Sequence, residues 1–379
     1  MKYVDTPDAL AEAEKLIARS KWASVDCEAD SLHHYAEKLC LIQISVEGED
    51  LIIDPLAKLD LVPMASALQA RPEPIVLHGA DFDLRMVKRA SSSFAAKEIF
   101  DTLIAAQLLG YERQGYADLV RMHAGVELSK SAQKADWSRR PLDDKLLEYA
   151  ANDTHFLKLV SERMDAELME LGRKEWHRQS CAKLVRSVET PREERVRDGR
   201  EWQIKGSRDL KGVSLTVLKN LWYWRDHEAQ RRDRPSFKVV NTDVLVDVAK
   251  WAAENPGQDV AVMPKAPSNV RRDYRDIMNR LIREAEAGPQ AVFAVPLKSS
   301  QRQRWGNAES KRMDELKKVR DEITAPLKIH ASLVSTNAML EDVAMARPKT
   351  REALRDAAGY MEWQLDLVEE RFLKITNEI

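Results

Sequence analysis

Hydrophobic residues in the first 165 positions alternate between patterns typical of strands and patterns typical of helices. Strand-like runs occupy residues 23–28, 39–46, 51–53 and 74–78. Helical patterns follow at residues 83–90 and from Pro141 onward. Segments in this order predict an α/β domain in which helices flank a mixed β-sheet.

Beyond residue 172 the strand signals fade and the pattern becomes helical. Apolar residues recur at helical spacing in residues 215–232, 241–255, 270–287 and 310–379, with a Pro-, Gly- and Ser-punctuated break at 288–306. Residues 333–344 share the rhythm of residues 239–252, in which a polar cap and an apolar pair precede an Asp-Val-Ala step. This similarity indicates a repeated small helical domain. We therefore expect one or two all-α domains after the α/β domain.

Composition narrows the class of protein further. Hydrophobic residues make up 44% of the chain and charged residues 32%, as in globular proteins. The 60 Lys+Arg nearly balance the 62 Asp+Glu, so polyanion binding would depend on local patches. Three cysteines without a CxxC pair exclude a disulfide framework and a thiolate zinc site.

The N-terminus has an acidic helical pattern where a signal peptide needs an apolar core, and no apolar run approaches 18 residues. We expect a cytoplasmic protein with no membrane segment and no obligate protein partner.

Two carboxylates lie close together in the first clear strand. Asp26 and Glu28 are two residues apart, so both side chains point to the same face of the sheet. Their mutual repulsion and desolvation would be costly, and a bound divalent cation removes both costs. The alternative is an edge strand whose polar face meets water.

Further acidic residues follow later elements. Asp81 and Asp83 come just after the strand that ends at His78, where Asp81 is expected to cap a helix and Asp83 to lie in its first turn. Tyr149 and Asp153 are four residues apart and therefore share one face of a helix. Taken singly, each of these carboxylates is better explained as a helix cap, or as a surface Asp bonded to a tyrosine hydroxyl, than as a metal ligand.

Together, these residues resemble the DEDD 3′–5′ exonuclease superfamily, tyrosine subgroup. The stretches FDTLIAAQLLGY, KSAQKADWSRRPL and IDPL are similar to ribonuclease D, and the resemblance covers about residues 1–170. LKNLWYWRD and RRDRPSF resemble an HRDC domain, a helical nucleic-acid-binding module, and the last helices resemble a divergent second copy.

The resemblance implies a ribonuclease H-like exonuclease domain followed by HRDC-like helical domains. The domains expected are an exonuclease domain (1–170), a connection (171–209), an HRDC domain (210–290) and a second HRDC-like domain (306–379).

The resemblance also implies the chemistry: a two-metal-ion phosphodiester hydrolase that uses Mg²⁺ or Mn²⁺. The catalytic set would be Asp26, Glu28, Asp83, Tyr149 and Asp153, with the four acids as metal ligands and Tyr149 orienting the attacking water. Asp81 remains a rival to Asp83. The expected substrate is RNA with a free 3′ end, in particular transfer-RNA precursors, trimmed to nucleoside 5′-monophosphates.

One residue departs from the family pattern. Cys27 stands where the family usually has Thr, but it points to the opposite face of the strand from the two acids. We therefore expect the metal site to survive this change.

Several other residues are candidates for substrate contact. They are Gln43, His78, Trp137, Arg139 and Arg140. Trp137 would stack a base and the arginines would meet phosphates. The alternative is a packed Trp with a solvated Arg pair, and a structural role for His78.

A second candidate surface lies in the HRDC-like region. It comprises Trp222, Tyr223, Trp224, Arg225, Arg231, Arg232 and Arg234. These residues would form either a basic, aromatic RNA-binding surface or a helical core with ordinary solvated arginines.

Two other functions remain open at this stage. A DNA 3′–5′ exonuclease would use the same acidic set, and a non-catalytic nucleic-acid-binding protein could share the fold. The helical domains and the complete acidic set favour an exoribonuclease over both.

Overall fold

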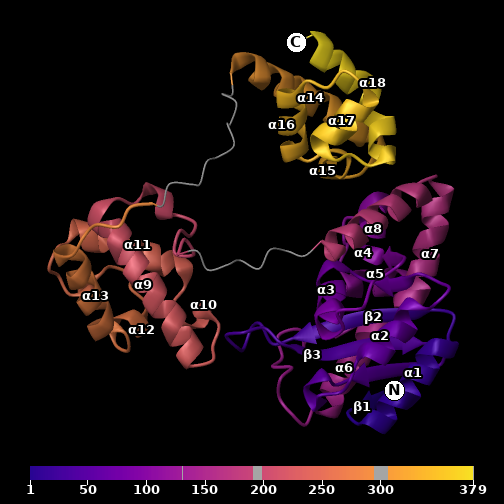
Figure 1. The fold of residues 1–379 in the computed structure, drawn as a ribbon, viewed down its shortest axis with the longest axis horizontal. Coiled ribbons are helices and arrows are strands. Elements are labelled where there is room, and N and C mark those ends of the chain that lie inside the picture. Colours follow the sequence, from indigo (N-terminus) through magenta and orange to yellow (C-terminus); the bar gives the residue numbers. More distant parts are fainter. Residues whose placement is uncertain (130, 191–198, 294–305, 379) are drawn as a thin grey trace. The chain divides into compact units, whose positions relative to one another are not determined.

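The computed structural model describes residues 1–129, 131–190, 199–293 and 306–378. The chain divides into two compact units (Figure 1). Unit 1 comprises Met1–Ala29, Leu39–Arg192 and Gln301–Ile379, and unit 2 comprises Asp30–Lys38 and Glu193–Ser300.

A six-stranded mixed sheet forms the centre of unit 1. Its strands are β1 (Lys2–Val4), β2 (Ala23–Ala29), β3 (Leu39–Val46), β4 (Glu49–Ile53), β5 (Ile75–Leu77) and β6 (Ile99–Asp101), in the spatial order β1-β4-β3-β2-β5-β6. The β2–β3 and β3–β4 pairs are antiparallel, whereas β1, β5 and β6 run parallel to their neighbours. The predicted strands and the α/β class are confirmed. The three-residue edge strands β1 and β6 were not predicted, because so short a run carries no periodicity.

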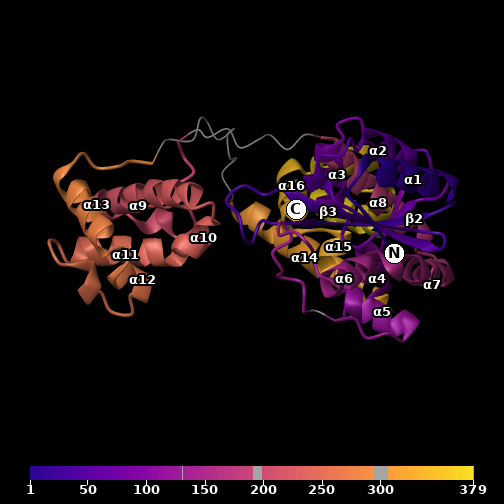
Figure 2. The same ribbon diagram turned by 90° about the horizontal axis from the view of Figure 1, so that it is seen from below.

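Helices cover both faces of the sheet (Figure 2). The helices of this part of unit 1 are α1 (Pro7–Arg19), α2 (Val62–Gln69), α3 (Asp81–Ala90), α4 (Thr102–Leu109), α5 (Tyr116–Ala124), α6 (Asp144–His155), α7 (Leu157–Glu170) and α8 (Lys174–Glu189). One hydrophobic core joins α1, α2 and α3 to one face, and α6 packs on the other face against β2, β3 and β4. Residues 40–46 of β3 are consequently all buried.

The last helices share a hydrophobic core with the part of unit 1 that contains the sheet. They are α14 (Asn307–Leu327), α15 (Ala331–Val334), α16 (Asn337–Ala346), α17 (Arg351–Ala358) and α18 (Glu362–Glu378). Their core is continuous with buried residues of α4, α5 and α7. The rings of Trp176 and Trp363 stack with centroids 4.8 Å apart, and Arg173 donates to the carbonyls of Leu108 (2.6 Å) and Leu327 (2.9 Å). These helices therefore belong to the body that carries the sheet.

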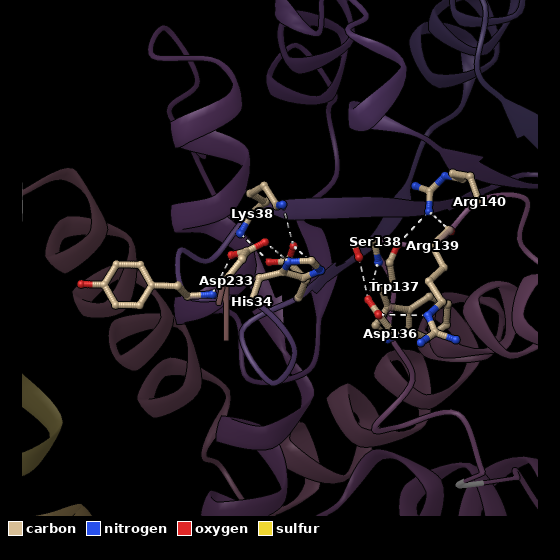
Figure 3. Close-up of polar contacts among 10 residues, drawn as sticks. His34, Lys38, Asp136, Trp137, Ser138, Arg139, Arg140 and Asp233 are labelled. Atoms are coloured by element: carbon tan, nitrogen blue, oxygen red, sulfur yellow. Dashed lines mark hydrogen bonds and ion pairs between the residues drawn. The ribbon is translucent and has the colours of Figure 1, made fainter. Parts of the chain in front are cut away.

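Unit 2 is a helical bundle with its own core. Its helices are α9 (Gly212–Arg231), α10 (Ser236–Val239), α11 (Thr242–Glu254), α12 (Ser268–Arg271) and α13 (Arg275–Ala287). The segment 30–38, which connects β2 to β3 along the chain, clusters with this unit. There Asp233 accepts the Tyr35 N–H (3.1 Å) and lies 2.7 Å from His34 Nδ1 (Figure 3).

The aromatic and basic residues of α9 are mostly part of that core. Trp222 and Trp224 pack against the buried residues of unit 2, and Arg225 is buried and donates to the carbonyl of Val240. Arg231 and Arg232 both pair with Glu228. The structure therefore favours the helical core over a continuous RNA-binding surface at these residues, with Tyr223 the exposed aromatic of the group.

The expected internal repeat is visible in the helices. A four-residue helix and a two-residue link precede a longer helix in both copies, as α10 and α11 in one and α15 and α16 in the other. Across the residues described, no helix is both long and apolar enough to span a membrane.

Gly110 allows the last helices to approach α4. It ends α4 with φ +78°, and a Cβ built there would lie 2.3 Å from the carbonyl oxygen of Lys328. Gly125 is a matched control, because it ends α5 with φ +70° and has open space around it.

We expect Gly110→Ala to lower the thermal unfolding midpoint more than Gly125→Ala. Both substitutions place a Cβ in the left-handed region at a cost of about 1–2 kcal/mol. Only Gly110→Ala also overpacks a contact, which adds about 1–3 kcal/mol. Differential scanning calorimetry of the two variants measures the difference, and equal midpoints would show that this approach is not tight.

Candidate active site

The acidic pair of β2 faces α6. Ser45 on β3 pairs with Ser24 on β2, and the Ser45 hydroxyl lies 2.7 Å from that of Thr154 on α6. Since directly paired and alternate residues share a face, Asp26 and Glu28 also point toward α6. β2 lies between β3 and β5, which excludes the alternative of a solvated edge strand.

Cys27 points the other way, as expected. Its side chain belongs to the core under α1, α2 and α3, and its Sγ lies 3.9 Å from the Asp83 carbonyl oxygen. Burial raises the pKa of this thiol well above its usual value, so it stays protonated.

Helix α6 brings Tyr149 and Asp153 over the same face. Asp143 caps the helix by accepting the N–H of Leu146 (2.8 Å), and the buried Ala150 and Ala151 let α6 lie close to the sheet. One carboxylate oxygen from each of Asp26, Glu28 and Asp153 lies within 4.8 Å of the others. Three residues from two elements therefore converge on one point.

Asp83 completes the acidic set and Asp81 does not. Asp83 lies in the first turn of α3, is 4% exposed and lines the same cavity as the other three acids. The Asp81 side chain is 38% exposed and pairs with Arg85 (3.0 Å). The expectation that Asp81 caps the helix is wrong, because α3 begins at Asp81 itself and its N-cap is Ala80.

These residues line a cavity of about 450 Å³. The four carboxylates, Tyr149 and His78 form one part of its wall, and residues 115–117, Ser129 and Gln133 form another. A cavity of this size suits one small ligand.

The electrostatics of the cavity disfavour four bare carboxylates. Burial raises the pKa of Glu28 to about 9, with a further contribution from the charge on Asp26. The pKa values of Asp26, Asp83 and Asp153 are raised for the same reason, and each of the latter two is raised further by Asp26. Hard divalent cations such as Mg²⁺ and Mn²⁺ prefer such oxygen ligands, so the residues fit a metal site.

Asp101 is a site-supporting residue that the sequence motifs did not single out for a role. This buried side chain accepts hydrogen bonds from the N–H groups of Gly79 and Ala80 (both 2.9 Å). It also caps α4 through the N–H groups of Leu103 and Ile104. Asp101 thereby fixes the two residues that lead from His78 into α3. A detectable signal was its position between an apolar run and a helix, which is typical of an N-cap.

Trp137 and Arg140 have structural roles, contrary to the expectation of substrate contact. Trp137 is 1% exposed and its ring lies 6.0 Å from that of Tyr149 in the same hydrophobic core, so it presents no face to a base. Arg140 forms two bonds with the buried carboxylate of Asp54 and donates to the carbonyl of Cys40. The bonds to Asp54 raise the pKa of Arg140 despite the opposing effect of burial.

Arg139 lies at the surface, whereas Gln43 lies in the interior. The Arg139 side chain is 82% exposed and pairs with Asp136, outside the residues that line the cavity (Figure 3). Gln43 pairs with Asp26 across β2 and β3 and is fully buried, and neither atom of its amide has a partner among the described residues. Gln43 therefore lies next to Asp26 and away from the surface.

Comparisons with known proteins show which parts of the chain match known families. The 3′-5′ exonuclease family model matches residues 1–169, and the HRDC domain model matches residues 214–279 and again 309–376, which confirms the repeat. Ribonuclease D from Pseudomonas paraeruginosa is 32% identical over 298 residues, which cover 78% of each chain. Exosome complex component 10 from Rattus norvegicus is 31% identical over 76% of this chain, which spans only a third of that protein's length.

The fold is also found in a solved structure. The crystal structure of Escherichia coli RNase D, described as an exoribonuclease involved in structured RNA processing, has a TM-score of 0.65 and 21% identity, covering 100% of this chain and 98% of that one.

We expect Mg²⁺ or Mn²⁺ to raise the unfolding midpoint more at pH 9 than at pH 6. The carboxyl pKa values are raised in the folded state, so without metal the stability from this cluster is lost as pH rises through them. A divalent cation competes with protons for the same oxygens and restores that stability at high pH.

Thermal melts with and without metal at each pH measure the effect as a difference. Asp26→Asn should abolish the metal-dependent shift, whereas Asp81→Asn, on the same turn as Asp83 but outside the cavity, should keep it. If the metal-dependent shift in the unfolding midpoint does not change with pH, or is equal in the two variants, the metal binds elsewhere.

Proposed function

The chain belongs to the ribonuclease D family, and we propose that it is a metal-dependent 3′–5′ exoribonuclease acting through the acidic cavity of unit 1. The observation that carries the proposal is the convergence of Asp26, Glu28 and Asp153 within 4.8 Å, with Asp83 and Tyr149 on the same cavity wall. Five polar groups from β2, α3 and α6 meet where isolated carboxylates would be costly.

We assign four side chains as ligands of two divalent ions, Mg²⁺ or Mn²⁺. Asp26 would serve both ions, Glu28 and Asp153 would complete one site, and Asp83 would hold the other ion mainly through water. Asp83 lies outside the group within 4.8 Å, which supports that division. When bound, two such ions activate water and stabilise charge on the attacking and leaving oxygens of a phosphodiester.

Tyr149 is proposed to orient the attacking water. Burial and the nearby carboxylates raise the pKa of its hydroxyl, so the group keeps its proton and acts through hydrogen bonding rather than as a base. Trp137 behind the ring limits its movement.

The proposed substrate is RNA with a free 3′ end, with transfer-RNA precursors in the cytoplasm as the natural class. A cavity of about 450 Å³ suits one terminal nucleotide, which favours stepwise release of nucleoside 5′-monophosphates. The similarity to a structured-RNA exoribonuclease and the two HRDC matches support RNA over DNA.

We assign the domains as an exonuclease domain (1–170), a connection (171–209), an HRDC domain (210–290) and a second HRDC-like domain (306–379). The two HRDC matches support this division. The last domain shares its core with the exonuclease domain.

A 5′-labelled RNA with a single-stranded 3′ tail tests the activity. We expect a ladder that shortens from the 3′ end with Mg²⁺ or Mn²⁺ and is absent with EDTA. Asp26→Asn should slow cleavage at least about 100-fold. Removing a residue that only hydrogen-bonds a metal ligand already costs up to about 100-fold, and Asp26 is assigned as a ligand itself.

The Asp81→Asn control should keep the wild-type rate, since Asp81 lies outside the cavity. A matching DNA cut as fast as the RNA would favour a DNA exonuclease. If RNA is bound but not cut with either metal, the result would favour a non-catalytic nucleic-acid-binding protein.

Tyr149→Phe separates orientation from metal binding. This variant retains the ring against Trp137 and loses only the hydroxyl. We expect kcat to fall about 10²- to 10³-fold, the range for the loss of one positioned hydrogen-bond donor. The metal concentration at half-maximal rate should stay unchanged, and a shift in that concentration would place Tyr149 among the metal-site contacts.

A further inference from the structure

His78 lies on the cavity wall with a fixed tautomer. Its Nδ1 is 2.9 Å from the hydroxyl of Thr102, and that hydroxyl donates to the carbonyl of Leu77 (3.1 Å). A threonine hydroxyl has one proton, and a carbonyl only accepts. Because the Thr102 hydroxyl donates its proton to the Leu77 carbonyl, its oxygen must accept the hydrogen bond from His78. The hydrogen of the neutral ring is therefore on Nδ1.

The second ring nitrogen of His78 is therefore a hydrogen-bond acceptor. Burial lowers the pKa of His78, which keeps the imidazole neutral at pH 7. With Nδ1 protonated, the neutral ring leaves a lone pair on Nε2. Nε2 has no partner among the residues that the structure describes, and the ring is held 5.8 Å from that of Tyr116 on the cavity wall.

The chemistry of a nucleotide decides what such an acceptor can bind. Phosphate oxygens only accept, so neutral Nε2 cannot bind them. Base N–H groups differ from one nucleotide to the next, whereas a stepwise exonuclease must accept every base. Ribose hydroxyls are donors present on every RNA nucleotide, and the 2′ hydroxyl is the group that distinguishes RNA from DNA.

We propose that His78 is a specificity-determining residue whose Nε2 accepts a hydrogen bond from a ribose 2′ hydroxyl near the 3′ end of the substrate. This inference rests on the proposed exonuclease function, and it gives the acidic cavity a means of preferring RNA. His78 acts on the sugar and takes no part in holding the metal.

Single deoxy substitutions combined with substitutions of His78 test the contact. The substrates are one RNA, the same RNA with a 2′-deoxy terminal nucleotide, and the same RNA with a 2′-deoxy penultimate nucleotide. Single-turnover cleavage rates with Mg²⁺ are compared for the wild type, His78→Phe and His78→Gln. Phe keeps a ring beside Tyr116 but has no acceptor, and Gln restores an acceptor.

We expect the wild type to cut one of the deoxy substrates about 5- to 150-fold more slowly than the RNA, the cost of leaving one hydrogen-bonding group unpaired in the complex. In His78→Phe this ratio should fall to about one, and in His78→Gln it should be partly restored. If His78→Phe slows all three substrates equally, the residue is structural through Thr102 and the proposal is overturned. A wild type with no preference at either position overturns it as well.

Binding distinguishes this proposal from the proposed function. Affinities for the three oligonucleotides are measured by fluorescence anisotropy with Ca²⁺ in place of Mg²⁺. If the wild type cuts none of the three substrates, the proposed exonuclease function is wrong. A binding preference for the ribose that is lost in His78→Phe would still support the contact. An affinity ratio near one in both proteins would refute it.

Discussion

The withdrawal of four carboxyl groups from water around one cavity is the main physical constraint on this protein. Asp26, Glu28, Asp83 and Asp153 lie at one cavity, and burial raises the pKa of each. Such a cluster opposes folding when it is ionised and is stabilised by a cation that binds several of its oxygens. Protons and a divalent cation therefore compete for the same carboxylate oxygens.

Rigid neighbours hold the cluster in place. Ser45 links β3 to α6 at Thr154, so the helix that carries Tyr149 and Asp153 is bonded directly to the sheet. Asp101 bonds the chain between His78 and α3 through two backbone N–H groups. Arg140, bonded to Asp54 and to backbone carbonyls, secures the segment that positions Trp137 behind Tyr149. These contacts serve the site without touching a ligand.

The two copies of the helical repeat are used differently. The copy that ends the chain buries its aromatic residues against α4, α5 and α7, and Trp363 stacks on Trp176 of α8. The copy in unit 2 has a separate core, which takes in Trp222 and Trp224. A helical module can therefore stabilise the body that carries the catalytic sheet in one place and remain a separate unit in another.

Sequence patterns alone were enough to predict the alternating strands, the helical C-terminal half, the repeat and the acidic residues, with Asp81 and Asp83 left as rivals. Periodicity places Asp26 with Glu28 on one face and Tyr149 with Asp153 on another, because both patterns depend only on local geometry. Local geometry does not bring distant elements together or assign burial. Tertiary contacts were needed to show that Asp83 and not Asp81 reaches the cavity. They also showed that Trp137 and Arg140 have structural roles and that Asp101 bonds the residues before α3. Each depends on which elements pack against which, and that is set by contacts between residues far apart in the chain.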